Sequence, residues 1–324
     1  MSSDQKAAPT ADRTAPAAPE STLTVLVAFG ANLLIAVAKS VAALLTGSAS
    51  MVAEAAHSWA DAGNEVFLFV AGRRSARRRD EAHPLGYGKE SYVWSMFAAF
   101  GLFTAGAVVS IMHGVSELSS TEEDSDYLVA YVVLAVAFVL EGTSFLRALR
   151  QARGTARRTR TPLLRSVLRG SDPTLRAVFA EDAAALVGLV VAFLGILLHE
   201  LTGDAVWDAV GSILVGVLLG VVALVLIDRN RRFLVGERPG PEVRSRVLGR
   251  LLERPDVARV TYLHLEFVGP SRVYLVAAVD LTGDEREEHV AVALRRLEAD
   301  LEEHDLVEEA VLTLATPDEP GLRP

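Results

Sequence analysis

The 324-residue sequence contains no cysteine. A disulfide framework, a zinc ribbon, a thioredoxin-type motif and a thiol nucleophile are therefore excluded, and any metal site has to be built from imidazole, carboxylate or carbonyl groups. The sequence also lacks an excess of basic residues, because 32 Lys and Arg stand against 41 Asp and Glu, for a formal net charge of -9. A chain with this charge balance is not expected to bind nucleic acid or another polyanion.

Residues 1–21 lack the basic start and the apolar run that are typical of a cleavable signal peptide. They are rich in Ala, Pro and small polar residues, a composition typical of disordered segments. We therefore expect residues 1–21 to form a disordered cytoplasmic tail.

Apolar residues are abundant in the rest of the chain, since 51% of all residues are hydrophobic and the mean hydropathy is +0.30. A soluble domain of this size seldom reaches such values. Roughly twenty apolar residues are needed for a helix to cross about 30 Å of hydrocarbon. Six stretches of that kind lie at about 22–46, 50–72, 91–117, 126–149, 175–200 and 206–228. They predict a polytopic α-helical membrane protein in which residues 22–232 form six transmembrane helices.

The loops between these stretches differ in charge, and Lys and Arg stay on the cytoplasmic side during membrane insertion. The second and fourth loops, GRRSARRRDEAHPLGYGKE and RALRQARGTARRTRTPLLRSVLRG, are rich in Arg. The other three, near TGSAS, SSTEEDSDY and LTGDAVW, are neutral or acidic. We therefore expect both termini to be cytoplasmic and the protein to lie in the plasma (inner) membrane.

Beyond Arg232 the long apolar runs give way to short amphipathic units. Apolar residues recur at helical spacing in 241–253, alternate in VARVTYLHLEFV and SRVYLVAAVDL, return to helical spacing in 290–301 and alternate again near LVEEAVLTLAT. The predicted order is α-β-β-α-β. Residues 233–324 are thus expected to form a cytoplasmic α+β domain of the ferredoxin-like kind that serves mainly in dimerisation.

The second apolar stretch carries Glu54, His57, Asp61 and Glu65, spaced three, four and four residues apart, with Asn64 beside them. This spacing places the four ionisable groups on one face of a helix. A charged side chain in mid-bilayer costs about 2.5–3.5 kcal/mol on insertion scales, so such residues indicate function. A hydrogen-bonded polar seam is the structural alternative, but four groups on one stripe favour a cation site.

The fifth stretch supplies Glu181 and Asp182 near its cytoplasmic start. Neighbouring residues project about 100° apart on a helix, and of the two we expect Asp182 to point at the second stretch. Imidazole and carboxylate ligands suit zinc and other late first-row divalent ions. Without thiolates the binding is expected to be moderate, as a carrier requires.

The segments TGSASMVAEAAHSWADAGNE and HPLGYGKE resemble the signature motifs of the cation diffusion facilitator family of zinc and divalent-metal exporters, and the resemblance covers almost the whole chain after residue 21. It implies a homodimer that is not an enzyme and has no resident cofactor. Each subunit would bind a divalent cation, zinc first, between the second and fifth spans and exchange it for protons by alternating access. His57, Asp61 and Asp182 match the family's transport site.

One family ligand is missing. The family usually has His or Asp four residues before Asp182, where this chain has Val178. Glu181 could take its place, or Asn64, Glu65 or water could complete the shell. The sequence resembles the branch that includes the mitochondrial and nuclear-associated zinc transporters, and manganese, cobalt or iron remain open as substrates.

The family's second, interfacial metal site matches Asp80, His83 and Tyr87, where the last position is more commonly His. We expect this second site to be weaker than the first. A lone His in a Pro-Gly loop is also typical of a turn.

Two other functions use the same residues. An intramembrane metalloenzyme would use such ligands to activate water, although no HExxH pair is present. A metal-responsive membrane scaffold would bind metal without transporting it and recruit a partner through its acidic tail.

Overall fold

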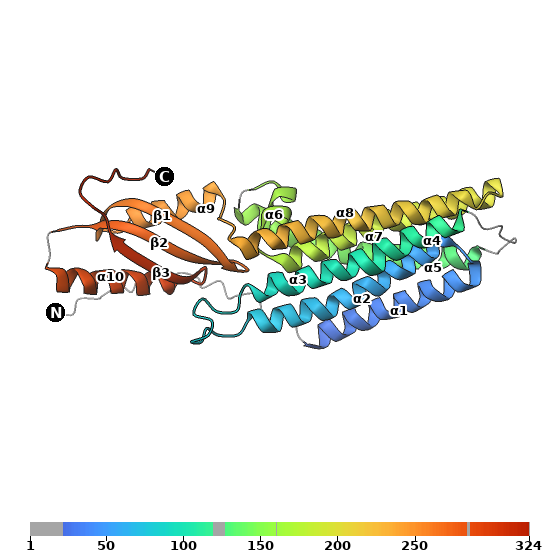
Figure 1. The fold of residues 1–324 in the computed structure, drawn as a ribbon, viewed down its shortest axis with the longest axis horizontal. Coiled ribbons are helices and arrows are strands. Elements are labelled where there is room, and N and C mark those ends of the chain that lie inside the picture. Colours follow the sequence, from blue (N-terminus) through green and yellow to red (C-terminus); the bar gives the residue numbers. More distant parts are fainter. Residues whose placement is uncertain (1–21, 119–126, 160, 284–285, 324) are drawn as a thin grey trace, which may run out of the picture.

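The computed structural model describes residues 22–118, 127–159, 161–283 and 286–323. The predicted tail at residues 1–21 lies outside this part of the chain, as does most of the acidic SSTEEDSDY loop. A helical bundle occupies one end of an elongated molecule and a small α+β domain occupies the other (Figure 1). The bundle contains α1 (Thr22–Thr46), α2 (Ala49–Ser75), α3 (Glu90–Gly101), η1 (Leu102–Val108), α4 (Val109–Glu117), α5 (Leu128–Thr159), α6 (Leu163–Arg169), α7 (Pro173–Thr202) and α8 (Val206–Val235).

Within the described residues, five helical segments are long and apolar enough to cross a membrane. They are Phe29–Thr46, Glu90–Glu117, Leu128–Arg157, Pro173–Thr202 and Val206–Val235. Large apolar side chains on their outer faces are exposed, among them Leu44 at 85% and Met112 at 68%, as expected for helices that face lipid. The chain is therefore a multi-pass membrane protein.

Helix α2 is the second predicted span and is not among these five, because it differs from them in composition. It has 27 residues, but its ionisable side chains make it too polar to face lipid. Instead it packs against α1, α3, α7 and α8, so that its polar side chains are enclosed by the bundle. Ser48 caps its start, where the side chain accepts a hydrogen bond from the Met51 amide at 3.1 Å.

The third predicted span is not one continuous α-helix. It consists of α3, α4 and the π-helical segment η1 between them. Such π-helical turns are often found beside functional sites. Here the turn begins next to Gly101, which faces the Asn64 side chain of α2 closely enough that an added Cβ would lie 3.6 Å from Asn64 Oδ1.

The C-terminal domain follows the predicted α-β-β-α-β order, with α9 (Pro241–Leu252), β1 (Val257–Gly269), β2 (Arg272–Leu281), α10 (Glu287–Glu302) and β3 (Val307–Leu314). Strand β2 lies between the other two, antiparallel to β1 and parallel to β3. Helix α9 packs against β1 and helix α10 against β3. Leu248, Leu275 and Leu297 are buried in the core between the helices and the sheet.

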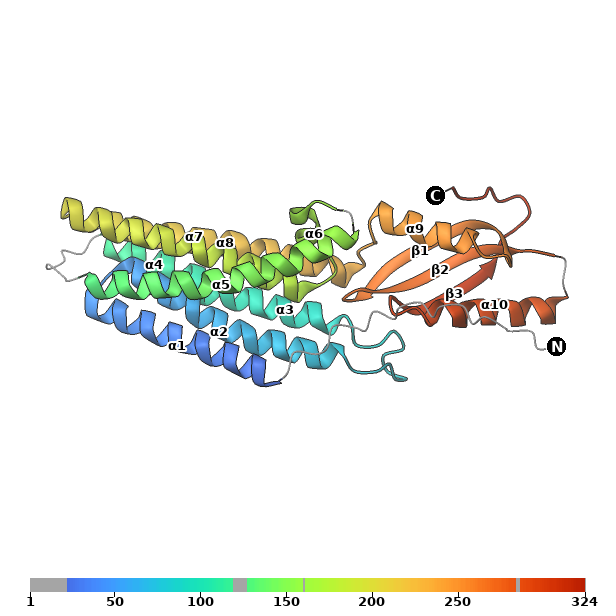
Figure 2. The ribbon, with the colours of Figure 1, turned by 180° about the vertical axis from the view of Figure 1, so that it is seen from behind.

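The β1–β2 hairpin touches the end of the bundle where α3 begins (Figure 2). Gly88 and Gly269 approach so closely that a Cβ on Gly88 would lie 2.7 Å from the Gly269 Cα. Lys89 Nζ forms an ion pair with Glu266 Oε1 at 3.0 Å, and the Phe233 ring of α8 lies 5.6 Å from that of Phe267 in β1. The C-terminal domain therefore marks one end of the bundle, and positions along α2 can be described relative to it.

Candidate functional site

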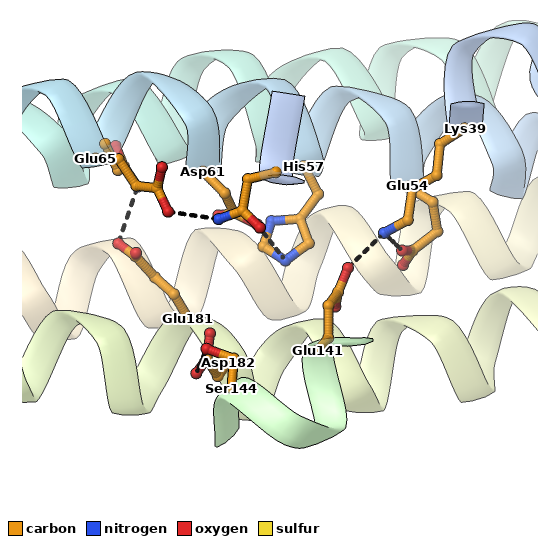
Figure 3. Close-up of polar contacts among 11 residues, drawn as sticks. Lys39, Glu54, His57, Asp61, Glu65, Glu141, Ser144, Glu181 and Asp182 are labelled. Carbon is orange, nitrogen blue, oxygen red and sulfur yellow. Dashed lines mark hydrogen bonds and ion pairs between the residues drawn. The ribbon is translucent and has the colours of Figure 1, made fainter. Parts of the chain in front are cut away.

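The polar side chains of α2 lie on one face, as their spacing predicts. Glu54 and His57 are fully buried and Asn64 is 1% exposed. The series runs along α2 from Glu54 to Glu65 and faces residues of α1, α5 and α7 (Figure 3). The later end of α2 is the one nearer the C-terminal domain (Figure 1). We refer to Glu54, His57, Asp61, Asn64 and Glu65 as the α2 polar stripe.

His57 and Asp61 form the centre of the stripe, with His57 Nε2 3.5 Å from Asp61 Oδ2. Both ring nitrogens of His57 and Asp61 Oδ1 are buried and make no hydrogen bond within the described part of the chain. Buried polar atoms are nearly always hydrogen-bonded, and exceptions need an explanation. An imidazole nitrogen and a carboxylate with free lone pairs are the donor set that zinc prefers in a site without thiolates.

Helix α7 brings Glu181 and Asp182 to the same region, but the two carboxylates have different partners. Asn64 Nδ2 donates to Glu181 Oε1 at 2.9 Å. Ser144 Oγ of α5 donates to Asp182 Oδ2 at 2.9 Å. The hydrogen bond to α2 is thus made by Glu181, whereas the sequence favoured Asp182 for that contact, because helical spacing alone does not reveal the competing hydroxyl on α5.

The residues at the two ends of the α2 polar stripe also have side-chain partners on other helices. At the end near the C-terminal domain, Asn32 Nδ2 of α1 donates to Glu65 Oε1 at 2.6 Å. At the far end, Lys39 of α1 lies between Glu54 and Glu141 of α5. Sequence reasoning missed Glu141, although a carboxylate inside the apolar run AVAFVLEGTSF is the same signal that singled out the second stretch.

Within the residues that the structure describes, no three His, Asp or Glu side chains are already arranged to hold a metal ion. The donors lie on α2 and α7, which pack together, and both α7 carboxylates accept hydrogen bonds from neutral groups, Glu181 from Asn64 and Asp182 from Ser144. A divalent cation interacts with a carboxylate more strongly than a neutral amide or hydroxyl does. Glu181 and Asp182 thus each accept a hydrogen bond from a neutral group that a cation could displace.

The second predicted site lies in the loop between α2 and α3. His83 N donates to Asp80 Oδ1 at 2.9 Å, and the Tyr87 hydroxyl donates to Asp80 Oδ2 at 2.7 Å. The Tyr87 hydrogen bond holds the pKa of the Asp80 carboxyl below its usual range and raises the pKa of the Tyr87 phenol. His83 Nδ1 lies 3.5 Å from Asp80 Oδ1. The loop thus presents one imidazole and one carboxylate, and the third position is a hydroxyl that stays protonated at neutral pH.

Tyr87→His is expected to complete this loop site, because it adds a second imidazole at the position whose side chain already reaches Asp80. Three ligands of this kind are enough for a zinc site with an open position. We expect the variant to bind about one more zinc ion per chain than the wild type, measured by equilibrium dialysis. Adding His83→Ala to Tyr87→His should abolish the gain; a gain that survives this change would place the extra ion elsewhere.

The family model described as cation efflux transmembrane domain matches residues 25–235. The chain is 36% identical over 233 residues to metal tolerance protein C4 of Arabidopsis thaliana, covering 72% of this chain and 51% of the relative. It is 36% identical over 259 residues to the mitochondrial proton-coupled zinc antiporter SLC30A9 of Xenopus laevis, covering 80% of this chain and 46% of the relative.

The chain thus spans about half the length of these relatives. A more distant relative is magnetosome protein MamM of Paramagnetospirillum magneticum, 24% identical over 249 residues, with 75% of this chain and 72% of the relative covered. The names of the first two relatives describe metal handling and transport rather than catalysis. This agrees with the prediction that the chain is not an enzyme.

Proposed function

The chain belongs to the cation efflux family. From this membership we propose that it moves a divalent metal cation across a membrane in exchange for protons, with zinc as the preferred substrate. The working form is a homodimer in which each subunit carries one transport site and alternates its access between the two sides. Helix α2 crosses the membrane as the second of six spans, and its polar face lines the path. The similarity to relatives named as a zinc antiporter supports zinc over manganese, cobalt or iron.

The observation that carries this proposal is the proximity of His57 and Asp61 inside the bundle, where both ring nitrogens and Asp61 Oδ1 are buried and make no hydrogen bond within the described residues. The proposed ligands are His57, Asp61, Asp182 and Glu181, the last replacing the ligand that Val178 cannot supply. Asp80 and His83 form a weaker second site. Because imidazole and carboxylate bind either a proton or a metal ion, protons and the metal ion cannot occupy the His57–Asp61 site at the same time.

Because protons and the cation compete for the same ligands, the pH gradient sets the direction of the exchange. Protons that enter from the side of higher acidity occupy the ligands and release the cation there. Loss of those protons towards the other side restores the affinity for the next cation. With both termini in the cytoplasm, as the Arg-rich loops favour, the cation leaves the cytoplasm. We place the protein in the plasma (inner) membrane, and note that the SLC30A9 relatives are named as mitochondrial.

The test is a panel of metal ions in proteoliposomes that hold the full-length protein and an imposed pH gradient. Zinc is expected to give the fastest flux, accompanied by proton movement in the opposite direction. At zero membrane potential each pH unit can support up to about a tenfold zinc gradient for every proton exchanged, so the final gradient reports the stoichiometry. Saturable zinc binding without flux would instead favour a metal-responsive scaffold.

A further inference from the structure

A lysine ammonium is buried in the bundle between two glutamates. Lys39 Nζ of α1 lies 2.8 Å from Glu54 Oε2 of α2 and 2.8 Å from Glu141 Oε1 of α5 (Figure 3). The side chains of Lys39 and Glu54 are fully buried, and that of Glu141 is 12% exposed. We call these three residues the buried triad. A buried ion pair is weak evidence for stabilisation, because the cost of removing both charges from water offsets much of the attraction.

The cation between Glu54 and Glu141 is a lysine rather than an arginine. The chain uses 29 Arg but only three Lys, and Lys39 is one of the three. Arginine presents a rigid planar fork, whereas lysine presents a compact point charge on a flexible stem that can move away from its partners. The place between Glu54 and Glu141 is therefore occupied by a compact, movable cation in a chain that otherwise favours arginine.

The triad has more acceptors than its lysine uses. Two carboxylates and one ammonium leave one uncompensated negative charge. Glu54 Oε1 and Glu141 Oε2 are buried and make no hydrogen bond within the described residues. Glu54 Oε1 points to where α7 has Gly188, since a Cβ there would lie 2.7 Å from this oxygen. The oxygen thus occupies space that any larger residue at position 188 would fill.

The triad also lies next to the proposed transport site. Glu54 is three residues before His57 on the same face of α2, about 4–5 Å along the helix axis, on the side away from the C-terminal domain. A cation that leaves His57 and Asp61 in that direction therefore meets Glu54 and Glu141 first.

We propose that Glu54 and Glu141 form an additional, outer site for the transported dication and that the Lys39 ammonium occupies this site while the dication is absent. This inference rests on the proposed function. When the dication arrives, two positive charges replace one against two carboxylates, which neutralises the pair. The outer site has oxygen ligands without imidazole, so it binds zinc more weakly than the His57 site and passes it on. When the dication leaves, Lys39 returns and closes the route.

Lys39→Met tests the outer site directly, because methionine keeps much of the side-chain volume and removes the charge. Full-length purified protein is dialysed against buffered free zinc, and the bound zinc is counted by mass spectrometry. We expect Lys39→Met to bind about one more ion per chain than the wild type and Lys39→Met/Glu54→Gln to lose that gain. Lys89→Met removes a half-buried lysine that pairs with Glu266 of the C-terminal domain, away from the triad, and should leave the count unchanged. A folded Lys39→Met protein with the wild-type count would overturn the proposal.

The comparison separates this inference from the proposed function. If the wild type carries zinc but Lys39→Met binds no more than it does, only the outer site is rejected. If the wild type neither binds nor carries zinc, the proposed function fails, and the difference between the two proteins still reports on Glu54 and Glu141.

Glu141→Gln provides a second measurement that does not depend on the folding of Lys39→Met, since the Lys39–Glu54 ion pair remains. We expect the maximal rate of zinc flux to fall about tenfold or more, with zinc binding at the His57–Asp61 site unchanged. Glu141→Asp keeps a carboxylate and should retain most of the rate. A purely structural role would lower the unfolding temperature and leave the flux below that temperature intact, and this outcome would contradict the proposal.

Discussion

Asp61→Ala is expected to lower zinc-driven proton flux in proteoliposomes by about 100-fold or more, because even partners that only support metal ligands are worth 10- to 100-fold in affinity. Asp61 is the carboxylate next to His57 on α2, at 3.5 Å. Its removal leaves the imidazole as the single α2 ligand. Flux is measured with a pH-sensitive dye inside the vesicles after zinc is added outside. His57→Ala and Asp182→Ala should have effects of the same order.

The fold is expected to survive Asp61→Ala, because Asp61 Oδ1 has no hydrogen-bond partner among the described residues and alanine favours the helix. Asp300→Ala serves as a matched control. Asp300 pairs with Arg254 at 2.7 Å on the surface of the C-terminal domain, and such exposed pairs contribute little to stability. Full flux in a folded Asp61→Ala protein would exclude this site as the transport site.

The positions of the long helices could be predicted from the sequence, since an apolar run of about twenty residues has few alternatives to a membrane helix. The first stretch was predicted at 22–46 and α1 spans Thr22–Thr46. The end of α5 was not predictable in this way. The apolar run ends near residue 149, but the helix continues to Thr159, because the Arg and Gln residues that follow favour a helix although they are too polar for lipid.

The stripe of α2 was predictable for a similar reason, since helical spacing determines which side chains share a face. What that spacing cannot supply is the partner on another helix. The hydrogen bond from Ser144 to Asp182 and the ion pair of Glu141 with Lys39 join residues that are 38 and 102 positions apart in the chain. They depend on how α5 packs against α1 and α7, which hydropathy does not specify.

Substitution of Glu181 tests whether this side chain replaces the metal ligand that the family usually has at the position of Val178. Glu181 is 7% exposed and hydrogen-bonded to Asn64, and in the proposed site it supplies the ligand missing at Val178. Glu181→Gln keeps the size and the hydrogen bond but removes the charge. Zinc flux should therefore fall by about 10- to 100-fold, while the thermal stability of the protein changes little.

Val178→His in the Glu181→Gln background is expected to restore flux to within about tenfold of the wild type, because histidine is a preferred zinc ligand. Position 178 is one helical turn from Asp182 and three residues from Glu181, so all three lie on neighbouring parts of one face. Val187→His on the exposed side of α7 should give no rescue. If Glu181→Gln alone keeps full flux, or if Val178→His restores nothing, then Glu181 does not replace the missing ligand and the metal completes its shell with Asn64, Glu65 or water.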